Sequence, residues 1–232
     1  MSNDQLQKQI TFMIKEPLLI TGGCSLSDPE ESDYDNGTIV WPIVVSKILN
    51  IKLLNVAKKG CSNDYIENTV FDSILKNHKK YDIQVMVLWS GADRINVFDT
   101  DTYAGDRQNY DQKKILNKTF RNIKRLDLIC RYFNIPSYHR IGVGFENNDE
   151  LNEWLTEHPM LKEFNLSLFE ILSGRWSSKS EGAHAQWVLD KGHPNQDGQN
   201  AIAQMFIDTM NNIPLGTLDV QSKSIEDNFI YE

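Results

Sequence analysis

The sequence predicts an α/β protein in which helices cover both faces of a parallel sheet. Short apolar segments alternate with helical patterns along the chain, and residues 83–89 are apolar almost throughout, as in a strand covered on both faces. A length of 232 residues suits one domain with a substantial core. We expect residues 1–212 to form this domain. Residues 213–232 would form a C-terminal tail, for which packing on a partner subunit is one option.

The first expected strand covers residues 18–21 and is stopped by Gly22-Gly23. An acidic stretch follows at residues 28–35, which suggests a solvated loop or a lid that repels anions. A helix is then expected to begin at Trp41-Pro42. Proline suits the first turn of a helix, because the N–H that it lacks would have no partner within the helix there.

The next strand is expected at residues 52–57 and is followed by a polar turn. Ser62 or Asn63 can cap a helix over residues 65–75. The apolar run at 83–89 is the third strand, and Ser90-Gly91 ends it.

The second half of the chain is less regular. Residues 95–112 are polar and predict a loop, whereas apolar spacing predicts a helix over 113–133 and a fourth strand near 135–143. Residues 149–173 suggest two helical pieces. A last helix is expected from Pro194-Asn195 to about Met210.

The composition restricts the partners of the protein. Lysine and arginine number 24 against 32 aspartates and glutamates, which gives a net charge of −8. This balance argues against binding to duplex nucleic acid or to an anionic membrane, since both favour a basic surface. No apolar run is long enough to span a membrane and no signal-like start is visible, so we expect a cytoplasmic protein, with association with a virion as an option. Three cysteines are too few for a disulfide framework.

Three residues together could supply nucleophilic catalysis. Ser25 follows a strand and a Gly-Gly turn, and Asp190 and His193 lie three residues apart before the last helix. A serine hydroxyl becomes a good nucleophile when a histidine takes its proton and a carboxylate orients that histidine. Capping or turn roles are the structural alternatives for Ser25 and His193.

The same residues lie in blocks that resemble those of the SGNH (GDSL-like) hydrolases, including members from bacteriophages and marine microbes. Gly23-Cys24-Ser25-Leu26 resembles the first block, Asn55 to Gly60 the second, and Asp190 to Pro194 the last, D-x-x-H-P. The resemblance implies a flavodoxin-like three-layer α/β/α fold with about five mostly parallel strands. It also implies Ser25 as nucleophile, His193 as base and Asp190 as its partner, with the N–H groups of Ser25 and Gly60 forming the oxyanion hole.

The third block departs from the family pattern. Its usual asparagine, which donates to the oxyanion, is replaced by Ala92. Asn63, Ser90 or Arg94 can be considered as substitutes, and Trp89 and Trp187 as residues that line a substrate pocket. In the first block Cys24 stands where the family has an aspartate, and a Cys24 nucleophile would leave Ser25 without a role.

These features predict a serine esterase acting on a small ester, such as an O-acetyl group on a carbohydrate, without a metal or cofactor. The alternatives are a weak or inactive binding or structural module on the same fold, for example a virion or assembly component, and an acyltransferase. A homo-oligomer is a further option, in which the tail at residues 213–232 would pack on a neighbouring subunit.

Overall fold

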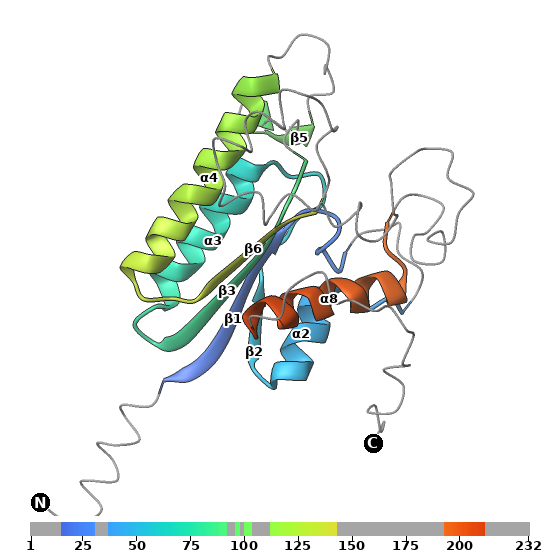
Figure 1. Ribbon diagram of the computed structural model, residues 1–232, viewed down its shortest axis with the longest axis vertical. Coiled ribbons are helices and arrows are strands. Elements are labelled where there is room, and N and C mark those ends of the chain that lie inside the picture. Colours follow the sequence, from blue (N-terminus) through green and yellow to red (C-terminus); the bar gives the residue numbers. More distant parts are fainter. Residues whose placement is uncertain are drawn as a thin grey trace, which may run out of the picture.

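A computed structural model gives the structure of the chain, and it describes residues 15–30, 37–91, 96–97, 100–103, 112–142 and 193–211. These residues form a layered α/β arrangement (Figure 1). In chain order the elements are β1 (Glu16–Gly23), α2 (Trp41–Leu49), β2 (Lys52–Asn55), α3 (Asn63–Asn77), β3 (Tyr81–Trp89), β4 (Asn96–Val97), β5 (Thr100–Tyr103), α4 (Gln112–Tyr132), β6 (Ser137–Ile141) and α8 (Gln196–Met210).

The main sheet of the described residues has four strands in the order β2-β1-β3-β6, all parallel. This order is the one in which doubly wound flavodoxin-like sheets begin. The expected fold class is therefore confirmed, and the four described strands are close to the five expected. Because the strands are parallel, their carboxyl ends lie at one edge of the sheet.

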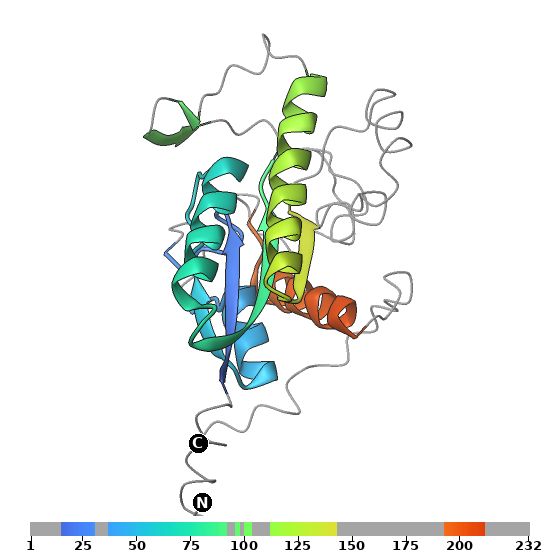
Figure 2. The same cartoon turned by 90° about the vertical axis from the view of Figure 1, so that its left-hand side faces the viewer.

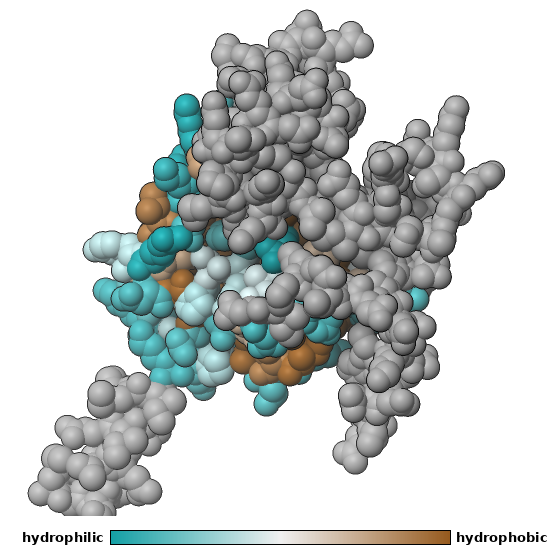
Figure 3. Space-filling view, viewed as in Figure 1, coloured by the Kyte–Doolittle hydropathy of each residue, from teal (hydrophilic) through white to brown (hydrophobic). Residues whose placement is uncertain are grey.

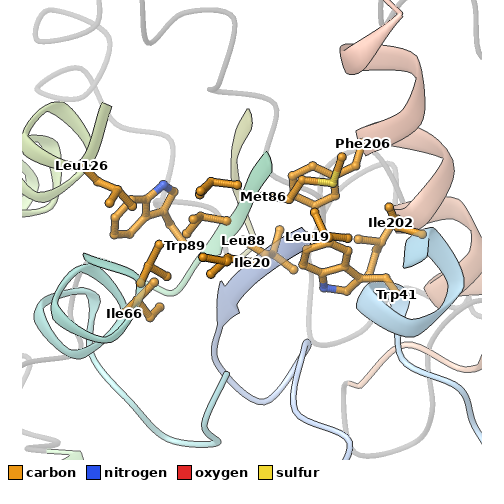
Figure 4. Close-up of a cluster of buried hydrophobic side chains, with 14 of the residues drawn as sticks. Leu19, Ile20, Trp41, Ile66, Met86, Leu88, Trp89, Leu126, Ile202 and Phe206 are labelled. Atoms are coloured by element: carbon orange, nitrogen blue, oxygen red, sulfur yellow. The ribbon is translucent and has the colours of Figure 1, made fainter. Parts of the chain in front are cut away.

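Helices cover both faces of this sheet (Figures 1 and 2). α3 and α4 pack on one face, and α2 and α8 pack on the other. The first layer encloses Trp89 between Ile66 and Leu126, whereas the second stacks Trp41 on Phe206 with ring centroids 4.4 Å apart (Figure 4). The apolar core is therefore split by the sheet into two halves.

Local signals in the sequence explain where the helices begin. Ser62 is the N-cap of α3, and its side chain accepts a hydrogen bond from the amide of Tyr65 at 3.3 Å. Asn195 caps α8 by accepting from Gly198 at 3.0 Å. Pro42 lies in the first turn of α2, as its missing N–H allows. All three helix starts lie within a residue or two of the positions that the sequence predicts.

One expectation was wrong. Residues 95–112 were predicted to be a loop, but β4 and β5 pair there as a short antiparallel ribbon, and α4 begins at Gln112. Short polar strands lack the alternating apolar pattern by which strands are predicted. The two helical pieces expected within 149–173 and the tail at 213–232 lie outside the described residues.

Hydrophilic side chains dominate the described surface seen in Figure 3, where hydrophobic residues form separate patches. Within the part of the chain that the structure describes, no helix is both long and apolar enough to cross a bilayer.

Candidate active site

The loops that follow β1, β2 and β3 meet at the carboxyl edge of the sheet, where doubly wound folds bind their ligands. Ser25 lies in the first loop, Gly60 in the second and Ser90 in the third. Three of the residues selected from the sequence are thus held at one edge by neighbouring strands.

Ser25 lies in a tight turn directly after β1. The turn is closed by a hydrogen bond from the amide of Ser27 to the carbonyl of Cys24 at 2.9 Å. Gly23 is required there, because a Cβ atom on it would lie 2.2 Å from Ser27 Oγ. The side chain of Ser25 is largely buried, with 7% of the residue exposed.

Gly60 occupies the third position of a β-turn over residues 58–61. The amide of Cys61 donates to the carbonyl of Lys58 at 3.3 Å, and Gly60 has a φ of +71° while Lys59 has a negative φ. These are the features of a type II turn, which favours glycine at that position. Within the described part of the chain, the N–H of Gly60 has no hydrogen-bond partner, so it remains available to an oxyanion.

The Gly60 turn is fastened to the Ser25 loop by several bonds. The amide of Lys58 donates to the carbonyl of Gly23 at 3.2 Å, and Asn55 Nδ2 donates to the carbonyl of Ser27 at 2.8 Å. The carboxylate of Asp28 accepts from the amide of Lys59 at 2.7 Å. The two loops therefore form one hydrogen-bonded unit.

Asp28 is a residue whose role the sequence did not reveal. The acidic stretch suggests solvated carboxylates, but Asp28 is buried, with 7% exposed, and also accepts from the amide of Glu30 at 2.9 Å. The motif Asp28-Pro29-Glu30 could have indicated the bond to Glu30, because the side chain of aspartate accepts from the amide two residues ahead in an Asx turn.

Asn63 fixes the third loop rather than pointing a free amide at a substrate. Its Oδ1 accepts from the amide of Ser90 at 2.9 Å, and its Nδ2 donates to the carbonyl of Ser90 at 3.1 Å and to Thr119 Oγ1 at 3.2 Å. Both hydrogens of the amide are thus engaged. Ser90 Oγ is buried and has no partner among the described residues, so a bound substrate would not reach it in this arrangement.

Trp89 is a core residue in the structure. It is fully buried, and its Nε1 donates to Nδ1 of His139 at 3.3 Å. Burial lowers the pKa of His139 to about 4, with the charge of Arg140 acting in the same direction. His139 is therefore neutral near pH 7. Contrary to the expectation from the sequence, the indole of Trp89 packs in the core and lines no pocket among the described residues.

His193 lies just before α8, and α8 is bonded to the segment that follows Ser25. Gln199 Nε2 donates to the carbonyl of Leu26 at 3.4 Å, and Gln199 Oε1 accepts from the amide of Trp41 at 2.8 Å. These bonds place the first turns of α8 next to the segment that follows Ser25. Asp190, Ala92, Arg94 and Trp187 lie outside the described residues.

Within the described ranges, no three histidine, cysteine, aspartate or glutamate side chains lie close enough together to hold a metal ion. What the described residues do provide is a serine loop, a turn with an available N–H, and a histidine just before a helix.

Comparison with known proteins agrees with this architecture. No protein-family model matches the sequence, and no curated protein matches it. Solved structures do match. A GDSL-like lipase from Bacteroides thetaiotaomicron aligns with a TM-score of 0.52 and 11% identity, over 90% of this chain and 97% of its own.

Two further structures give the same result. TesA aligns with a TM-score of 0.51 and 11% identity, over 84% of this chain and 99% of its own. A protein described as a candidate lipolytic member of the G-D-S-L family, from Desulfitobacterium hafniense, aligns with a TM-score of 0.50 and 14% identity, over 81% and 95%. The chain therefore has the fold of the SGNH, or GDSL, hydrolases, as the sequence blocks predict.

Proposed function

We propose that this protein is a serine esterase in which Ser25, His193 and Asp190 form the catalytic triad. The observation that supports this most is the Gly60 turn: it has an available N–H and is hydrogen-bonded to the loop of Ser25. The bond from Gln199 to Leu26 adds support, since it ties the helix after His193 to that same loop.

In the proposed reaction, Ser25 Oγ attacks the ester carbonyl carbon while His193 takes the hydroxyl proton. Asp190 holds the imidazole and stabilises its protonated form. The tetrahedral intermediate collapses as the bond to the leaving oxygen breaks, and His193 returns the proton to the departing alcohol. Water then attacks the acyl-enzyme with His193 again as base, and this step releases the acid and frees Ser25.

The N–H groups of Ser25 and Gly60 would stabilise the negative oxygen of each intermediate. Without the asparagine that Ala92 replaces, this hole keeps two donors. Loss of one donor typically costs about 10²- to 10³-fold in rate. We therefore expect a slow esterase, unless Arg94 supplies a third donor.

As substrate we propose a small acyl ester, with an O-acetyl group on a carbohydrate as the first choice. This choice rests on the resemblance to the SGNH hydrolases. An assay series of p-nitrophenyl acetate, butyrate and octanoate beside acetylated xylan tests it. Faster turnover of the octanoate ester than of the acetate would contradict the assignment.

The decisive test of the mechanism is Ser25→Ala. We expect the variant to lose hydrolysis of p-nitrophenyl acetate and labelling by a fluorophosphonate, with little change in its thermal midpoint. Ser46→Ala is the control, because it also removes one serine hydroxyl, which bonds to the carbonyl of Ile51 at 2.7 Å far from the site.

Two outcomes would overturn the proposal. Equal turnover by Ser25→Ala and the wild type would exclude Ser25 as the nucleophile. A folded wild type that neither turns over the ester nor reacts with the fluorophosphonate would instead indicate an inert module on a hydrolase fold.

A further inference from the structure

We propose that Asp28 is a positioning residue that holds the Gly60 turn in the orientation needed for an oxyanion hole. This inference rests on the proposed esterase function, and it adds a residue outside the triad and outside the sequence blocks that suggested it.

The contacts of Asp28 are specific to the two loops at the site. One carboxylate oxygen, Oδ2, accepts from the amide of Lys59 in the Gly60 turn, and the other, Oδ1, accepts from the amide of Glu30 in its own loop. The bond to Lys59 is short, at 2.7 Å. Hydrogen bonds to a charged acceptor are about twice as strong as neutral ones.

The Lys59 bond matters because of where it lies in the turn. In the turn over 58–61, the amides of Lys58 and Cys61 bond to backbone carbonyls, whereas the amide of Lys59 bonds to Asp28. Lys59 immediately precedes Gly60, so its position helps to fix the peptide plane that carries the Gly60 N–H. Without the carboxylate, this plane is free to rotate, and glycine resists rotation less than any other residue.

The other contacts between the loops do not replace this bond. Asn55 bonds to Ser27 and to the amide of Ala57, and Cys61 Sγ donates to the carbonyl of Gly23 at 3.4 Å. These bonds lie at the two ends of the segment. Among the described residues, Asp28 is the side chain that bonds to the central part of the Gly60 turn.

The test compares Asp28→Ala with Glu30→Ala. Both variants remove one acidic side chain from the same loop, but among the described residues Glu30 contacts Asp28 through its backbone N–H, which the control keeps. We expect Asp28→Ala to lower kcat for p-nitrophenyl acetate about 10- to 100-fold with KM within about twofold, because a misplaced group acts mainly on the transition state. Glu30→Ala should retain the kcat of the wild type.

A second measurement does not depend on activity. Amide NMR should show faster hydrogen exchange at Lys59 and a shifted Gly60 resonance in Asp28→Ala, with both unchanged in Glu30→Ala. Asp28→Asn, which keeps one carbonyl oxygen, should lie between Asp28→Ala and the wild type in both measurements. It also serves as the test variant if Asp28→Ala does not fold.

The outcomes separate this inference from the proposed function. Unchanged Lys59 exchange and Gly60 resonance in Asp28→Ala would overturn the contact itself. A mobile turn with unchanged kcat would overturn the positioning role while the esterase function stands. A wild type without activity or fluorophosphonate labelling would overturn the proposed function, and with it the catalytic purpose of Asp28, whereas NMR would still decide whether Asp28 holds the turn.

Discussion

All three thiols of the chain lie in its interior. Cys24, Cys61 and Cys130 are each at most 1% exposed. Burial raises the pKa of the Cys130 thiol to about 12, against a smaller opposing effect of a hydrogen bond with Ser137. A thiol buried in the interior is out of reach of a substrate. Cys24 therefore packs beside Ser25 as a small apolar side chain.

We predict that Ellman's reagent modifies none of the three cysteines in the native protein and all of them in guanidinium chloride. The reagent needs an accessible thiolate, which folding withholds at each position. Absorbance at 412 nm after mixing measures both reactions. Rapid modification of one native thiol, mapped to Cys24 by mass spectrometry, would contradict the burial and would make the thiol a competitor of Ser25.

Glu67 is a buried carboxyl group between α3 and α4. It pairs with Arg125 at 2.9 Å, but that arginine side chain is 64% exposed, so solvent screens the pair. Burial raises the pKa of Glu67, Asp64 adds to the rise, and Arg125 opposes it. The folded state therefore binds the Glu67 proton more tightly than the unfolded state does.

This raised pKa predicts how stability depends on pH. The pKa of Glu67 is higher in the folded state than in the unfolded state, so its ionisation destabilises the folded state. This destabilisation is complete above the folded-state pKa and is lost as the pH falls from there to the unfolded-state pKa. Glu67→Gln is neutral at every pH, so its stability relative to the wild type should be higher at pH 7 than at pH 4. Urea unfolding at both values measures this. A relative stability that is instead lower at pH 7 would mean that the Arg125 pair dominates.

At the scale of elements, α8 caps the helix it packs against. Val40, the N-cap of α2, makes no side-chain capping bond. Two glutamines of α8 serve instead: Gln196 Oε1 accepts from the amide of Ile39, and Gln199 Oε1 accepts from the amide of Trp41, both at 2.8 Å. The first turn of α2 thus depends on a helix from the other end of the chain.

We predict that Gln199→Leu lowers the free energy of unfolding by about 1–3 kcal/mol, because it leaves the buried amide of Trp41 and the carbonyl of Leu26 without partners. It should also lower kcat, since α8 follows His193. Urea unfolding and the acetate assay measure the two effects. Gln204→Leu is the matched control, because among the described residues Gln204 Nε2 bonds to Asp208 within the same helix. Equal stability of the two variants would contradict the capping role.

The sequence predicted the elements whose signals are local. The apolar run of β3, the cap at Ser62 and the spacing of α4 each depend on residues close together in the chain, and each is confirmed. The β4–β5 ribbon was missed because its strands are short and mostly polar, and its pairing is made by the backbone. Pairing between backbones leaves no pattern in the side chains when neither face is apolar.

For the whole molecule, topology made part of the site predictable. Ser25 and Gly60 follow neighbouring parallel strands, so their meeting at one edge follows from the strand order alone. The contacts of Asp28 with Lys59 and of Gln199 with Trp41 span 31 and 158 positions, and no nearby residue announces them. Side chains that join distant loops depend on the finished packing, which a sequence pattern does not contain.

The late position of α8 in the chain has a consequence for synthesis on the ribosome. One face of the sheet, which carries Met86, is covered by Trp41 of α2 and by Ile202 and Phe206 of α8 (Figure 4). The two residues of α8 can pack there only after this helix has left the exit tunnel. Until then a nascent chain presents an apolar surface and an uncapped α2, which is the kind of intermediate that chaperones bind. Synthesis of α8 would therefore be needed before this face of the sheet is covered and α2 is capped.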